Sequence, residues 1–145
     1  MIKFELVTMN GLKFGEEVYE VILPTSDGEI AILPHHIPLV SIAVPGVIGV
    51  RKRQGDSDDK IEYFATNGGV IEVQENSVRV LVDEADYADE INEQEAQKAF
   101  QKAQELHRVA KGKIELDQAK SLMDRHAVRL KVAGLRRHKR RQTNI

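Results

Sequence analysis

The sequence predicts an α+β protein, in which an N-terminal antiparallel β-sandwich of about eight to ten strands is followed by a C-terminal antiparallel two-helix hairpin. Short apolar runs separated by turn residues fill the chain before Asp83, with no helical periodicity among them. From Asp83 onward the apolar period changes from two to about 3.6 residues. The third observation is that every proline falls within or beside residues 25–50: Pro24, Pro34, Pro38 and Pro45. We therefore expect a rigid stretch of turns and strands there, at a sheet edge.

The strands are predicted from alternation and from β-branched content. Ile2, Phe4 and Leu6 share one face of the first strand, and Asn10-Gly11 supplies a turn with positive φ. The polar run 53–60 is predicted to be a hairpin tip, because little in it could be buried. The other predicted strands are 18–23, 30–33, 39–44, 47–52, 61–66, 70–73 and 78–82.

The end of the chain is predicted to be two helices separated by Lys111-Gly112-Lys113. Asn92 is placed as the N-cap of the first helix, with Glu95 as its N3 partner. These expectations divide the chain into a sandwich, residues 1–85, and a helical hairpin with a basic tail, residues 86–145. The apolar stripes consist mainly of alanine, so we expect the hairpin to be weakly attached and able to detach. The stripes are Ala96, Ala99, Phe100, Ala103, Leu106 and Ala110, then Ala119, Leu122, Met123, Leu130 and Ala133.

Composition excludes several classes of protein. The 145 residues include no cysteine, so disulfides and thiolate metal sites are excluded. No apolar run approaches the roughly 18 residues needed to cross a bilayer, and the N-terminus lacks the apolar core of a signal peptide. We therefore expect a protein that is kept in the cytosol or an equivalent compartment.

Charge is distributed unevenly along the chain. Residues 1–84 carry 7 Lys/Arg against 14 Asp/Glu, a net charge of −7, whereas residues 85–145 carry 14 against 9, a net charge of +5. From Arg125 to the end there are eight basic residues and no acidic one. Such a tail is often simply solvated, but it could also bind nucleic acid or an acidic protein segment.

Candidate catalytic and metal-ligating residues are weak. His35 and His36 resemble a metal pair, but neighbours on an extended segment point to opposite faces. Asp56, Asp58 and Asp59 lack the glycine and distal glutamate of a calcium loop. Neither a phosphate-binding G-x-x-x-x-G-K-[ST] run nor a nucleophile elbow occurs. We therefore expect neither a metal nor catalysis by this chain alone.

The sequence also carries a specific resemblance. The run GEIAILPHHIPLVSIAVPGV, followed by FATNGGVIEVQENSVRVLVDEA and a two-helix end, resembles the epsilon subunit of F-type ATP synthase over nearly the whole chain. The resemblance implies a non-catalytic central-stalk subunit that couples proton translocation at the c ring to rotation and ATP synthesis. It also implies that the C-terminal hairpin inhibits ATP hydrolysis.

The resemblance implies the partners and the place of the protein as well. The sandwich would contact the gamma subunit and the c ring, and the hairpin would contact the alpha and beta subunits. The protein would be peripheral on the cytoplasmic side of the plasma membrane in a bacterium, or on the stromal side of the thylakoid in a plastid. It would meet the membrane only indirectly, through the complex.

The residues expected to bind partners follow from the same resemblance. Glu29, His36 and Pro38 match the edge that faces the c ring in the family, although His36 is also explained as a loop-packing residue. Arg125 and Arg129, at i and i+4 on the second predicted helix, share a face and could present two guanidinium groups to an acidic segment of the beta subunit.

Some bacterial members of the family bind ATP through an I-D-x-x-R-A motif and two arginines of the second helix. Here Asn92 replaces the aspartate and Glu95 replaces the arginine, so no cofactor is expected. The alternative to the family interpretation is a free-standing β-sandwich binding module with a nucleic-acid-binding basic tail. The acidic sandwich and the absence of aromatic residues in the tail argue against nucleic acid.

Overall fold

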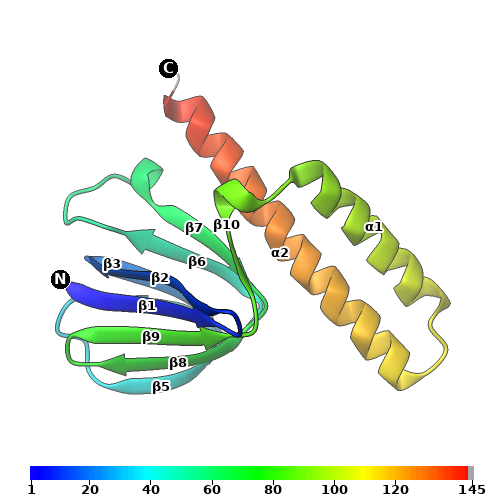
Figure 1. Cartoon of the computed structure of the whole chain (residues 1–145), viewed down its shortest axis with the longest axis horizontal. Coiled ribbons are helices and arrows are strands. Elements are labelled where there is room, and N and C mark those ends of the chain that lie inside the picture. The colour runs from blue at the N-terminus through cyan, green and yellow to red at the C-terminus, as the bar shows by residue number, and fades with distance from the viewer. Residues whose placement is uncertain (144–145) are drawn as a thin grey trace.

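The computed structural model describes the backbone of residues 1–143 and side chains as far as His138. It contains ten strands followed by two helices, with two short 3₁₀ turns, and confirms the predicted fold class (Figure 1). The strands are β1 (Ile2–Thr8), β2 (Gly11–Val18), β3 (Glu20–Thr25), β4 (Gly28–Ile32), β5 (Leu39–Ala43), β6 (Gly46–Arg51), β7 (Glu62–Thr66), β8 (Gly69–Gln74), β9 (Ser77–Val82) and β10 (Ala85–Tyr87). The 3₁₀ turns are η1 (Asp58–Lys60) and η2 (Ala88–Glu90), and the helices are α1 (Glu93–Val109) and α2 (Lys113–Thr143).

All ten strands belong to one strongly curved sheet. Their order is β10-β7-β6-β3-β5-β8-β9-β1-β2, and β4 pairs with β3 beside this path. β1 and β9 pair in parallel, while the other pairs of the described chain are antiparallel. The sheet folds over itself into the two layers seen in Figure 1, and one apolar core fills the space between them.

A row of aromatic rings joins the two ends of the sheet. Phe4 of β1 lies 5.6 Å from Phe14 of β2, Phe14 lies 5.5 Å from Phe64 of β7, and Phe64 lies 4.5 Å from Tyr87 of β10, measured between ring centroids. Such pairs add to the stabilisation that comes from buried area. Side-chain packing thus links β2 and β10, between which the sheet has no backbone ladder.

Two strands lie where the sequence did not predict them. β2 was missed because GLKFGEEV buries only Phe14 and Val18 and lacks clear alternation. It is a strand because it pairs with β1 from Ile2↔Val18 to Thr8↔Gly11, after a turn at which Gly11 has φ 111°. β10 lies where the helical period was expected to begin, and it extends the sheet by pairing with β7.

The hairpin packs on the outer face of the sheet. α2 lies against β7, and α1 lies on the side of α2 away from the sandwich (Figure 1). The side chain of Asn92 caps α1 as predicted, because its Oδ1 accepts a hydrogen bond from the backbone N–H of Glu95 at 3.0 Å. A second, small core joins the hairpin to the sheet and consists of Ala65, Ile91, Ala96, Val132 and Ala133. Small side chains let the elements approach closely but bury little apolar area.

The antiparallel pairing of β8 with β9 offers a test of how closely the sandwich is packed. A Cβ at Gly69 would overlap the carbonyl oxygen of Leu81, so Gly69→Ala forces the backbone of the ladder to shift. We expect this variant to lower the free energy of unfolding by about 1–3 kcal/mol, as overpacking of a closed core does. Urea denaturation measures it, and Gly112→Ala is the matched control because no atom lies within 4 Å of its added Cβ. Equal stability of the two variants would contradict the expectation.

Candidate functional site

The residues expected to face the c ring lie on β4 and on the segment that leads to β5. Glu29 is exposed on β4 opposite Pro24 of β3. His35 has φ 66°, so a turn replaces the extended segment that was expected there. His36 is half-buried, with Nδ1 2.7 Å from the carbonyl oxygen of Ile37, while Pro38 is exposed. Glu29 on β4 and Pro38 in the loop that follows are therefore both accessible to a partner.

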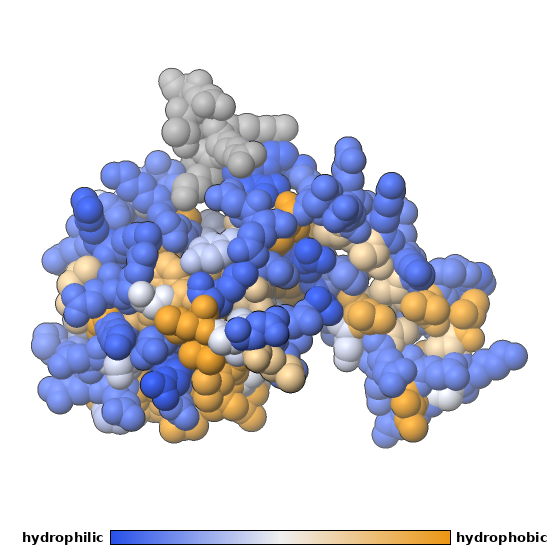
Figure 2. Space-filling model, viewed as in Figure 1, coloured by the Kyte–Doolittle hydropathy of each residue, from blue (hydrophilic) through white to orange (hydrophobic). Residues whose placement is uncertain are grey.

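An apolar row crosses the outer face of five neighbouring strands, and sequence reasoning did not identify it. The pairings Ile42↔Val70, Val70↔Leu81, Leu81↔Val7 and Val7↔Leu12 connect β5, β8, β9, β1 and β2. Ile42 is 66% exposed and Leu12 is 61% exposed. Figure 2 shows hydrophobic residues gathered over the part of the sandwich where β5, β8 and β9 lie in Figure 1. A continuous exposed apolar surface of this kind is typical of a protein interface.

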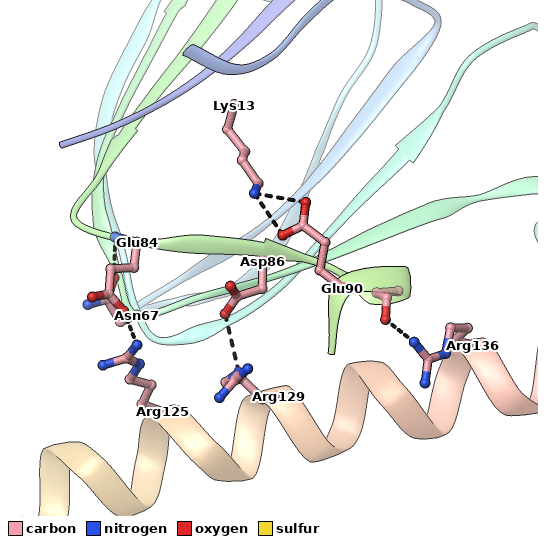
Figure 3. Close-up of polar contacts among 9 residues, drawn as sticks. Lys13, Asn67, Glu84, Asp86, Glu90, Arg125, Arg129 and Arg136 are labelled. Atoms are coloured by element: carbon pink, nitrogen blue, oxygen red, sulfur yellow. Dashed lines mark hydrogen bonds and ion pairs between the residues drawn. The ribbon is translucent and has the colours of Figure 1, made fainter. Parts of the chain in front are cut away.

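The segment that joins the sandwich to the hairpin, residues 83–92 and here called the linker, contacts two arginines of α2 (Figure 3). Arg125 forms an ion pair with Glu84, and Arg129 Nε lies 3.2 Å from Asp86 Oδ2. The Nε–H of Arg129 is not aimed at an acceptor, so this contact is an ion pair without a directed hydrogen bond. Arg125 and Arg129 do share a face, as predicted, and that face is turned toward the linker.

A third arginine extends the contact along α2. Arg136 Nη1 donates a hydrogen bond of 2.5 Å to the carbonyl oxygen of Ala88 in η2 (Figure 3). Within the hairpin itself, Arg137 Nη1 donates to Glu93 Oε1 at 2.6 Å. The α2 arginines through residue 137 are therefore engaged with acidic or carbonyl oxygens of the same chain. The side chains of the basic tail after His138 lie outside the described residues.

The sandwich holds the other side of the same linker. Lys13 of β2 forms an ion pair with Glu90 at 2.8 Å, and its backbone carbonyl accepts a hydrogen bond from the Tyr87 hydroxyl at 3.4 Å. The backbone N–H of Glu84 donates to Asn67 Oδ1 at 3.2 Å. Burial raises the pKa of the Tyr87 hydroxyl, with neighbouring carboxylates acting in the same direction. The linker is thus fixed to the sandwich before it meets α2.

Two signals for this site are present in the sequence. Glu84 and Asp86 are two residues apart, which on a strand places both on one face about 6.6 Å apart. Arg125 and Arg129 are four apart, about 6 Å along a helix. The spacings match, but only the tertiary structure brings the two pairs together.

His126 lies beside both arginines on α2. Its Nδ1 is buried and has no hydrogen-bond partner among the described residues. Burial is the main cause that lowers the pKa of this imidazole, and the charges of Arg129 and then Arg125 lower it further. The ring is therefore neutral near pH 7 and adds no third positive charge to this part of α2.

The acidic loop between β6 and β7 is held by an arginine. Arg51 lies 2.8 Å from Asp58 Oδ1 and 3.1 Å from Glu20 Oε2, and it donates a hydrogen bond to the carbonyl oxygen of Asp56. The hydrogen bonds to Asp58 and then to Glu20 raise the pKa of the guanidinium.

Among the described residues, no group of three or more His, Asp or Glu side chains could hold a metal ion. None of the described helices combines the length and the apolar character required to span a membrane.

Comparisons with known proteins cover the same two parts of the chain. The model of the ATP synthase delta/epsilon chain β-sandwich domain matches residues 1–88, and the model of the delta/epsilon long α-helix domain matches residues 89–134. The chain belongs to the epsilon subunit family of F-type ATP synthases. Members of this family are subunits of the central stalk, and the β-sandwich and two helices seen here are their two domains.

Individual relatives extend along nearly the whole epsilon chain. The ATP synthase epsilon chain of Herpetosiphon aurantiacus is 36% identical over 138 residues, covering 95% of this chain and 98% of the relative. The chloroplastic epsilon chain of Psilotum nudum is 34% identical, covering 93% of this chain and 98% of the relative. The fold is also similar to a chain in the Euglena gracilis mitochondrial ATP synthase structure, with a TM-score of 0.76 at 22% identity, covering 91% of this chain and 80% of that one.

Proposed function

We propose that this epsilon chain couples proton translocation at the c ring to rotation and ATP synthesis, and that its hairpin inhibits ATP hydrolysis. The chain would act as a non-catalytic subunit of the complex. Family membership along both domains carries the proposal, and the ion pairs of Arg125 and Arg129 show which contacts the docked hairpin makes. The sandwich, residues 1–85, would serve the rotor, and residues 86–145 would serve regulation, although β10 is physically a strand of the sandwich sheet.

The partners follow from the surfaces described above. The apolar row through Ile42, Val70 and Leu81 is the surface proposed to dock on the gamma subunit, because it would otherwise expose large apolar side chains to water. Glu29, His36 and Pro38 are proposed to face the c ring. The complex would hold the chain at the cytoplasmic face of a bacterial membrane, or at the stromal face of the thylakoid in a plastid. The α2 arginines with described contacts meet oxygens of this chain, which does not favour nucleic acid as a partner.

Glu29 is the residue that tests the docking surface. Glu29→Lys reverses an exposed charge without touching the core, so we expect a folded subunit and weaker proton pumping by the reconstituted enzyme. Glu17→Lys is the matched control, because Glu17 is also exposed but lies on β2, the last strand of the sheet order, whereas β4 pairs with β3. ATP-driven acidification of proteoliposomes is the measurement. Pumping unchanged by Glu29→Lys, or equally reduced by both variants, would remove the docking role.

The hairpin is proposed to contact the alpha and beta subunits when it leaves the sandwich. Deleting residues 91–145 keeps β10, Tyr87 and the Lys13–Glu90 pair in the sandwich. We expect this truncated subunit to stay folded and to raise the rate of ATP hydrolysis by the assembled complex. Steady-state hydrolysis with full-length subunit is the control. A truncated complex that hydrolyses ATP no faster would show that the hairpin is not inhibitory.

The folded hairpin is proposed to need no nucleotide. The side-chain oxygen of Asn92 already accepts the capping hydrogen bond of α1, and the carboxylate of Glu95 would repel a polyphosphate. The arginine pair that would meet phosphates, Arg125 and Arg129, is already paired with carboxylates. We therefore expect isothermal titration of the chain with ATP to show no saturable binding below about 1 mM. A dissociation constant in the micromolar range would overturn this proposal.

A further inference from the structure

We propose that Glu84 and Asp86 act as an internal acidic ligand for the arginine pair of α2, so that docking of the hairpin and binding of an acidic protein segment compete for the same two side chains. This inference rests on the proposed role of the hairpin, and it names the contacts that hold the hairpin in its docked position. It concerns Arg125 and Arg129, which would otherwise be free to meet a partner.

The first argument is geometric. Asp86 is held in β10 by its pairing with Ala65 of β7, and the backbone of Glu84 is tied to Asn67. The two carboxylates therefore stay with the sandwich when α2 moves away. The arginines leave with α2, so undocking separates the pairs and exposes two guanidinium groups one helical turn apart. Such a pair is suited to carboxylates of another chain.

The second argument concerns energy. Of the five described residues buried in the core beneath the hairpin, three are alanines, namely Ala65, Ala96 and Ala133, and larger side chains such as Tyr63 are only partly buried there. The four charged side chains are 23–49% exposed, so each ion pair contributes modestly and is screened by salt. Two modest ion pairs can decide the position of a hairpin whose apolar contact is also modest. The opposite net charges of residues 1–84 and 85–145 act in the same direction.

Undocking can be followed at Ala65 in the full-length chain. Ala65 lies on the outer face of β7, is 3% exposed and is covered by the hairpin. The chain has no cysteine, so Ala65→Cys creates one thiol that a reagent reaches only when the hairpin leaves. Under conditions where reclosing outpaces labelling, the labelling rate follows the undocked population.

The key variant is Glu84→Gln with Asp86→Asn in the Ala65→Cys background. We expect labelling about tenfold faster than in the parent, about threefold for each pair, within the range of partly exposed ion pairs. Glu17→Gln with Glu75→Gln removes the same charge from exposed side chains elsewhere on the sandwich and should leave the rate unchanged. Glu84→Arg with Arg125→Glu restores one pair with its charges exchanged and should return the rate toward that of the parent. Raising NaCl from 0.1 M to 1 M should accelerate the parent more than the Glu84→Gln/Asp86→Asn variant.

Competition is tested with a hexaglutamate peptide as the probe. The peptide should bind Glu84→Gln/Asp86→Asn about tenfold more tightly than the parent and should accelerate labelling of the Ala65→Cys thiol. Arg125→Gln with Arg129→Gln should remove this effect. Equal labelling rates in the parent and in the Glu84→Gln/Asp86→Asn variant, or equal peptide affinity, would overturn the inference. These measurements use the isolated chain. A hairpin that does not inhibit hydrolysis in the complex would refute the proposed function, but it would not change the labelling and peptide results by which this inference is judged.

Discussion

The structure depends on how the linker strand β10 is held between the sandwich and α2. β10 pairs with β7 on one side, and the Lys13–Glu90 ion pair and Tyr87 connect it to β2. Asp86 of β10 and Glu84, the residue before this strand, then meet the arginines of α2. The sheet ladder holds the backbone at Asp86, and a hydrogen bond to Asn67 holds the backbone at Glu84. The sandwich thereby presents two carboxylates to the basic face of α2.

The two cores of the molecule differ in the size of their residues. The sandwich core contains a row of aromatic rings that joins β1, β2, β7 and β10, and its described buried residues all belong to strands. The core beneath the hairpin is centred on alanine and valine side chains. Apolar stabilisation scales with buried area, so the sandwich core contributes more of it than the small core beneath the hairpin.

The sequence predicted most of the fold and part of the site. Alternation located β1 and β9 well, and the N-cap at Asn92 was correct because capping is a local interaction. β2 was missed because its strand character comes from pairing with β1 rather than from its own pattern. The apolar row from Ile42 to Leu12 was missed for a similar reason. Its members come from five strands, and only register brings them together.

The sequence by itself determined the two-part organisation, the charge asymmetry and the family, because composition, period and motif spacing are properties of the chain. It also determined that Arg125 and Arg129 share a helix face, since a helix repeats about every 3.6 residues. Only the tertiary structure decided what that face meets. Glu84 and Asp86 are about 40 residues earlier in the sequence, and the curvature of the sheet and the docking of α2 bring them beside the arginines. Local patterns fix the direction in which a side chain points on its own element, whereas its partner depends on how separate elements pack.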